Sequence, residues 1–182
     1  MCIRDSAKAI DETTRKYMGT LWNTYAFFIL YAEIDQFNPK EHPLDKAELT
    51  LMDRWILSRL NSLVREVDDD LNEYKIFEAS RAMTDFVDDL SNWYVRRSRE
   101  RFWGKGMAGD KEAAFATLYH VLETMSRLTA PFTPFMAENM YRNLVCSVDK
   151  DAPISVHMTD FPVCDKTYIS AELEGHMRDL LE

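Results

Sequence analysis

Glycine and proline are scarce in this sequence, with 5 and 6 of them among 182 residues. Because both interrupt helices, and because leucine, alanine, methionine and charged residues dominate, the composition favours helix. Three cysteines are too few for a disulfide framework and indicate free thiols in a reducing compartment, so we expect a cytoplasmic location. No apolar run approaches the about 18 residues that a membrane span needs, which argues against a membrane partner.

Positive charge is also in deficit, because the formal net charge is -9. Such a balance argues against indiscriminate nucleic-acid binding, since the long-range field repels phosphate. Residues 96–105 are the exception, with five positive side chains against the single negative Glu100. The five are Arg96, Arg97, Arg99, Arg101 and Lys105. The composition therefore leaves a local basic site open.

Apolar side chains recur at spacings of three and four along most of the chain, which predicts a series of amphipathic helices. Thr50 followed by Asp53 predicts a capping box at the start of one helix. Asp110 is the expected N-cap of another, and Pro131 should end it. We expect helices over residues 8–34, 50–71, 76–103, 110–130, 134–145 and 170–182.

Two stretches interrupt this helical pattern. Residues 35–49 hold Pro39 and Pro43 among polar side chains and are expected to form a connector. After Cys146 the segment SVDKDAPISVHMTDFP is short, proline-bounded and β-leaning. The predicted fold is an all-α antiparallel helix bundle with a small irregular or β-leaning C-terminal tail.

The segment NWYVRRSRERFW, residues 92–103, combines cations with large aromatic rings. At 100° per residue, Trp93, Arg97 and Arg101 stay within about 80° of the direction of Phe86, an expected core residue, so a core face should continue as a cationic face. These arginines could pair with carboxylates and complement the helix dipole. Alternatively, arginines contact phosphates and rings stack on unpaired RNA bases, at about 1–3 kcal/mol per base. Both interpretations stay open at this point.

Other motifs do not indicate catalysis. The segment GKGMAG, residues 104–109, matches G-x-G-x-x-G, but a nucleotide cradle needs a strand before it, and here a helix is predicted. A helix stop explains the glycines better. Cys146, His157 and Cys164 have loose spacings and include no C-x-x-C pair, so no metal site is expected. No pair of carboxylates in an apolar setting suggests acid and base roles, so we expect no catalytic residue.

Five segments resemble the isoleucyl-tRNA synthetase family of class I aminoacyl-tRNA synthetases, and they come in that family's order. Together they span most of residues 15–162. NWYVRRSRERFW is the most specific, because the related valyl and leucyl enzymes differ there. The segments are LWNTYAFFILYAEID from Leu21, DRWILSRLNSLVREVDDDLNEY from Asp53, DFVDDLSNWYVRRSRERFW from Asp85, LTAPFTPFMAENMYRNL from Leu128 and SVHMTDFP from Ser155.

The resemblance implies a helical anticodon-binding domain over residues 46–148. Residues 1–45 would be a helical linker from the catalytic domain, and residues 149–182 a tail with the start of a truncated C-terminal region. The implied partners are isoleucine tRNA and the missing catalytic domain, and the chain is expected to be a monomer. MCIRDS looks foreign to the family, so residues 1–6 are expected to be non-native.

The family's ATP-handling signatures, H-x-G-H and K-M-S-K-S, are missing from this sequence, as is the editing domain. We therefore expect a fragment that uses no cofactor and does not aminoacylate by itself. The resemblance favours an RNA-binding patch in which at least one of Arg97 and Arg101 is structural. Its expected members are Trp93, Tyr94, Arg96, Arg97, Arg99, Arg101, Trp103 and Lys105.

Two other hypotheses compete with this one. A helical scaffold that docks on other domains predicts exposed apolar surface near residues 15–34 and 163–182, with no sequence-specific RNA binding. A nucleotide-dependent enzyme using GKGMAG predicts ATP or NAD binding, which a ligand-melting test would detect.

Overall fold

The computed structural model describes residues 11–12, 14–104, 106–107 and 109–181, so the expectations for residues 1–6 lie outside it. Helices and irregular segments make up this described part, which contains no strand, and the expected all-α class is confirmed. The α-helices are α2 (Thr20–Ile34), α3 (Leu51–Asn72), α4 (Ile76–Asp88), α5 (Arg96–Trp103), α6 (Asp110–Leu128), α7 (Pro134–Tyr141) and α8 (Ala171–Leu181). Wider π-helical segments cover Thr14–Gly19, Asp89–Val95 and Arg142–Cys146, and short 3-10 turns cover Leu44–Lys46, Val156–Met158 and Lys166–Tyr168.

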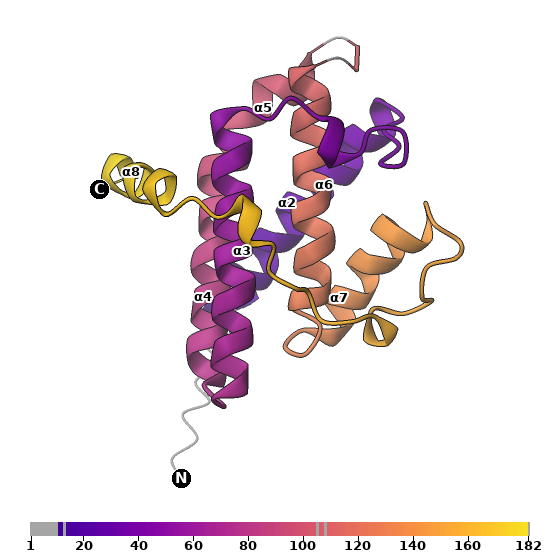
Figure 1. Ribbon diagram of the computed structural model, residues 1–182. Coiled ribbons are helices and arrows are strands. Elements are labelled where there is room, and N and C mark those ends of the chain that lie inside the picture. Colours follow the sequence, from indigo (N-terminus) through magenta and orange to yellow (C-terminus); the bar gives the residue numbers. More distant parts are fainter. Residues whose placement is uncertain (1–10, 13, 105, 108, 182) are drawn as a thin grey trace.

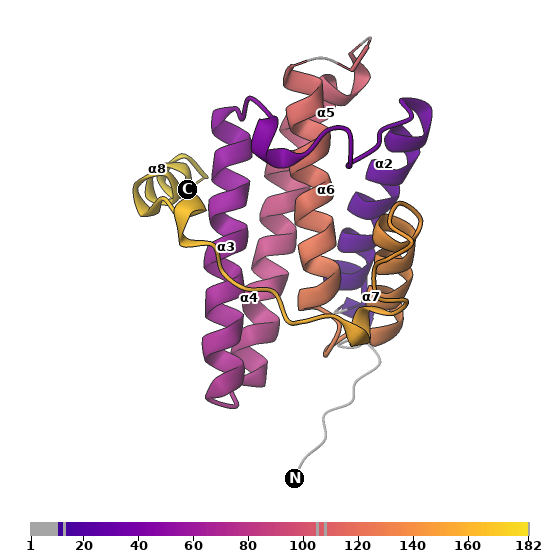
Figure 2. The same ribbon diagram turned by 45° about the vertical axis from the view of Figure 1, so that its right-hand side comes forward.

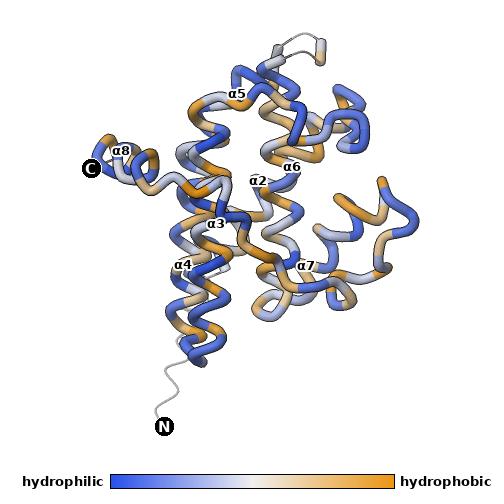
Figure 3. The backbone as a smooth tube through the Cα atoms, viewed as in Figure 1, coloured by the Kyte–Doolittle hydropathy of each residue, from blue (hydrophilic) through white to orange (hydrophobic). Residues whose placement is uncertain are grey.

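Four long segments lie side by side as an antiparallel bundle: α2, α3, α6, and α4 with its continuation into α5 (Figures 1 and 2). Helix α7 packs on the far side of α6 from α3, and α8 lies outside α3 (Figure 1). Helices α3 and α4 alternate hydrophobic and hydrophilic colours along their length, as burial of one face requires (Figure 3). No described helix has both the length and the apolar character needed to cross a membrane.

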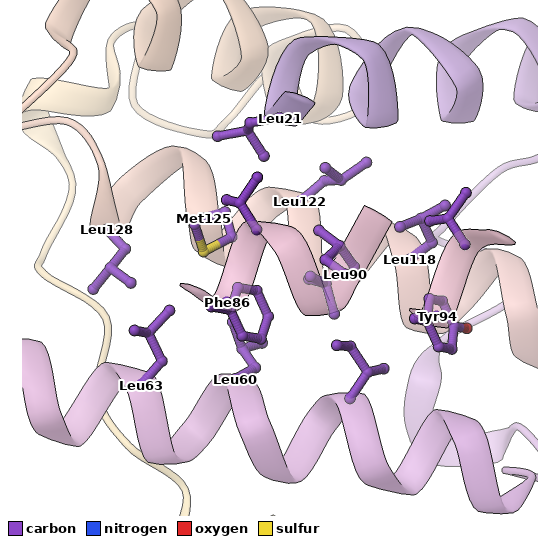
Figure 4. Close-up of a cluster of buried hydrophobic side chains, with 14 of the residues drawn as sticks. Leu21, Leu60, Leu63, Phe86, Leu90, Tyr94, Leu118, Leu122, Met125 and Leu128 are labelled. Atoms are coloured by element: carbon purple, nitrogen blue, oxygen red, sulfur yellow. The ribbon is translucent and has the colours of Figure 1, made fainter. Parts of the chain in front are cut away.

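One hydrophobic core joins the four segments. Leu21 from α2, Leu60 from α3, Phe86 from α4 and Leu122 from α6 are each at most 1% exposed and meet in the centre of the bundle (Figure 4). Burying a side chain of this size stabilises the fold by about 1.5–3 kcal/mol. The core therefore holds together segments separated by a hundred residues of sequence.

Helix α3 begins as the sequence predicts. The side chain of Thr50 accepts a hydrogen bond from the Asp53 amide at 3.3 Å, and the Asp53 carboxylate accepts one from the Thr50 amide at 2.9 Å. This capping box satisfies two amides that the helix leaves without partners. It also fixes the position of Asp53, which is fully buried.

The third predicted helix departs from regular α geometry, and this corrects the expected core stripe. Between Asp89 and Val95 the chain forms a π-helical segment, which has more residues per turn than an α-helix. After buried Leu90 the core face therefore continues through Tyr94 and Phe102 rather than through Trp93 and Arg101. A strict 100° rotation per residue misses this shift, because it assumes that every turn is α-helical.

One further expectation changes, at the start of α6. Gly109, not Asp110, occupies the N-cap position of α6, and Asp110 is the first helical residue, paired with Arg101. The segment after Cys146 forms no strand in the described chain; its extended residues are separated by 3-10 turns, so of the two expected alternatives the tail is irregular. The connector over residues 35–49 is irregular apart from one 3-10 turn, as expected.

Candidate nucleic-acid interface

Three arginines of α5 face solvent, and none of them forms an ion pair with a carboxylate among the described residues. Arg96, Arg97 and Arg99 are exposed, and the arginine ion pairs of the described chain involve Arg59, Arg101 and Arg127 instead. Helix α5 lies at one end of the bundle, beyond α4 (Figure 1). A guanidinium group that no carboxylate neutralises is available to a phosphate, and its planar fork favours two-pronged contacts.

Trp93 lies in the π-helical segment Asp89–Val95 that precedes this helix, and it is half-buried. The guanidinium carbon of Arg97 lies 4.9 Å from the centre of the Trp93 ring, which is a cation–π contact. Asn92, Trp93, Arg96 and Arg97 line a surface hollow of about 420 Å³. The structure therefore brings together an aromatic ring and two of the exposed cations of the expected patch.

Arg101, unlike the three exposed arginines, is largely buried and has carboxylate partners. Its two terminal nitrogens donate to the two carboxylate oxygens of Asp53 at 2.8 and 2.7 Å, and its Nε donates to Asp110 at 2.7 Å. Only 13% of its side chain is exposed. The structure therefore places Arg101 inside the fold and not on the expected RNA-binding surface. Of Arg97 and Arg101, at least one of which is expected to be structural, Arg101 has the structural contacts.

Tyr94 is also removed from the expected surface, because it is 0% exposed. Its hydroxyl donates to Asp53 at 2.7 Å. Burial raises the pKa of the Tyr94 hydroxyl well above its usual value, and the Asp53 charge adds to this effect. The physical reason for the correction is the π-helical segment, which turns Tyr94 inward and Trp93 outward.

The Asp53 carboxylate stays ionised despite its burial. Burial raises the pKa of this carboxyl, but hydrogen bonds from Arg101, Tyr94 and Thr50 outweigh that effect and hold the pKa below its usual value. An ion pair between α3 and α5, whose carboxylate also accepts a hydrogen bond from Tyr94, therefore anchors the helix that carries the exposed arginines.

Trp103 ends α5 with 57% of its surface exposed. Its indole nitrogen donates to the hydroxyl of Tyr31 at 2.8 Å, across 72 residues of sequence. Tyr31 was not among the expected site residues, and no local spacing could have indicated a contact between α2 and α5. Lys105, the remaining expected residue, lies outside the described part of the chain.

The GKGMAG segment has the surroundings of a helix stop. Helix α5 precedes it and α6 follows it, so the strand that a dinucleotide cradle requires is not there. Gly106 and Gly109 have φ values of 78° and 47°, in the region that favours glycine. No group of three or more potential metal ligands occurs among the residues that the structure describes.

Comparison with known proteins places this geometry in a family. A family model described as the anticodon-binding domain of tRNA ligase matches residues 53–182. The chain is 52% identical over 174 residues to an isoleucine-tRNA ligase of Clostridium novyi, 51% over 175 residues to one of Dehalococcoides mccartyi, and 49% over 170 residues to one of Bacteroides fragilis. These alignments cover 96%, 96% and 93% of this chain, but only 17%, 17% and 15% of the relatives. The chain belongs to the anticodon-binding domain family of tRNA ligases.

Proposed function

We propose that this chain binds the anticodon stem-loop of isoleucine tRNA, as the anticodon-binding part of an isoleucine-tRNA ligase. The observation that carries the proposal is the family match over residues 53–182, which contain the exposed Arg96, Arg97 and Arg99 on α5. In this proposal the rest of the longer enzyme attaches isoleucine to the tRNA with ATP. The chain itself works as a monomer in the cytoplasm, without catalytic activity of its own.

Charge distribution supports local rather than general RNA binding. The net charge of -9 opposes approach of a polyanion over most of the surface. Three exposed arginines within four positions concentrate the opposite charge on one helix turn. Phosphates contacted there release counterions, so affinity should fall with added salt.

The test is fluorescence anisotropy with the anticodon stem-loop of isoleucine tRNA and an anticodon-swapped version, at low and moderate salt. Arg97→Ala and Arg99→Ala should weaken binding and lower the salt slope by about one each where the arginine contacts a phosphate. Arg65→Ala is the matched control, because Arg65 is an exposed arginine on α3, outside the patch. Preference for the isoleucine anticodon supports the proposal, and equal, feeble binding to both RNAs contradicts it.

Exposed apolar residues favour a second candidate function, a scaffold that docks on other domains. Leu30 and Ile34 of α2 are 54% and 65% exposed, and Val163 in the tail is 88% exposed. These residues lie in the two regions where the scaffold hypothesis expects apolar surface. In that case neither RNA would bind with preference, and the arginine variants would bind like the wild type.

A further inference from the structure

We infer that Asn92, Trp93, Arg96 and Arg97 form a subsite for one unstacked nucleobase of a single-stranded RNA loop. The inference rests on the proposed RNA-binding function and deepens it. The hollow that these four residues line has a volume of about 420 Å³ and opens beside the exposed arginines of α5. It combines an aromatic face, two guanidinium groups and an amide within six positions of the chain.

The contact between Trp93 and Arg97 matches the chemistry of base stacking. Both the indole ring and the guanidinium plane stack on nucleobases. With the Arg97 carbon 4.9 Å from the ring centre, the cation shields one ring face in the absence of RNA. This cover keeps the apolar ring face out of water when no RNA is bound. When RNA binds, a base replaces the guanidinium on the ring or stacks on the outer side of the guanidinium.

Trp93 is held in place before any ligand arrives. It packs partly against the core, and the π-helical segment Asp89–Val95 turns it outward while Tyr94 turns inward. The ion pair of Arg101 with Asp53 fixes the following helix. A ring that is already ordered loses little conformational entropy when it binds, which distinguishes this ring from a freely rotating surface tryptophan.

Polar groups of both kinds line the hollow beside the ring. Asn92 donates from Nδ2 to Asp88 at 2.6 Å, which orients its amide. Arg96 and Arg97 supply positive charge, and neither is paired with a carboxylate in the described chain. Phosphates should therefore approach along the arginines, while the amide contacts the edge of a base.

The experiment is a double-mutant cycle that measures RNA affinity. It combines the protein variant Trp93→Leu with RNAs that carry a single abasic substitution at each loop nucleotide of the isoleucine tRNA anticodon stem-loop. Leucine keeps apolar bulk but cannot stack, so affinity for the intact RNA should fall about tenfold. One abasic position should weaken binding to the wild type about tenfold and have no further effect on Trp93→Leu. That position identifies the base that occupies the subsite.

Two variants serve as controls. Trp93→Phe keeps a ring and should retain most of the affinity, and Trp22→Leu removes a tryptophan on α2 outside the patch and should bind like the wild type. Urea unfolding of each variant shows whether an affinity loss reflects misfolding. If every abasic position weakens Trp93→Leu as much as the wild type, the subsite is overturned while RNA binding stands. If the wild type binds no RNA, the proposed function falls as well.

Discussion

Arg101 and Asp53 lie 48 residues apart in the sequence and form a two-pronged ion pair, with N–O distances of 2.8 and 2.7 Å, between helices α5 and α3. The same carboxylate accepts hydrogen bonds from Thr50 and Tyr94. One buried group therefore caps α3, pairs with the arginine of α5 and satisfies a buried hydroxyl. The exposed arginines of α5 depend on this contact for their position.

Removal of the Asp53 charge should strongly destabilise the fold. In Asp53→Asn, the largely buried Arg101 loses its main partner, and breaking a buried pair from one side costs about 3–5 kcal/mol. The measurement is urea unfolding, with Asp45→Asn as the control because Asp45 is an exposed aspartate in the connector. A loss of free energy of unfolding no larger than that of the control would show that the ion pair contributes little.

The pH dependence of stability should carry the signature of Asp53. Its pKa is lower in the folded chain than in the unfolded chain, so its stabilisation is complete above the unfolded pKa of about 4. That stabilisation is lost as the pH falls through the folded pKa. The deficit of Asp53→Asn relative to the wild type should thus be largest near neutral pH and shrink below about pH 4.

Asp89 acts in the opposite direction, because burial raises its pKa despite the nearby Arg59. Its ionised form is disfavoured in the folded chain, and acidification relieves that cost. The difference between the wild type and Asp53→Asn cancels this contribution and isolates Asp53. A deficit that stays constant from neutral to acidic pH would contradict the assigned role of the carboxylate.

Two glycine-to-alanine substitutions should have opposite effects. Gly109 has φ 47° and ψ -103°, a conformation that strains any side chain, so Gly109→Ala should cost about 1–2 kcal/mol. Gly175 lies in the middle of α8, and a Cβ atom there meets nothing within 4 Å. Gly175→Ala should therefore stabilise that helix by about 0.5–1 kcal/mol. Thermal unfolding measures the first effect, and hydrogen exchange of the α8 amides measures the second; the same sign for both would contradict the assigned backbone conformations.

Local sequence signals predicted much of the fold. The capping box of Thr50 and Asp53, the apolar stripes that include Leu60 on α3 and Phe86 on α4, and the helix restart at Pro134 all appear in the structure. These features depend on neighbours within one or two helical turns, so the residues that determine them are adjacent in the sequence. Such signals alone predict the all-α class. They also predict that NWYVRRSRERFW is a helical segment rich in cations.

Tertiary packing decided which residues of that segment face outward. A single π-helical segment rotates the side chains after Leu90, so Tyr94 is buried while Trp93 and Arg97 lie at the surface. The partners of Arg101 are carboxylates on α3 and α6, and that of Trp103 is a hydroxyl on α2. The sequence by itself thus determined where the helices and the cations lie along the chain. Only the tertiary structure decided which of the described cations pair with buried carboxylates and which stay exposed to solvent. That outcome depends on contacts between residues far apart in the sequence. It also depends on the rotation that the π-helical segment introduces, which local periodicity does not reveal.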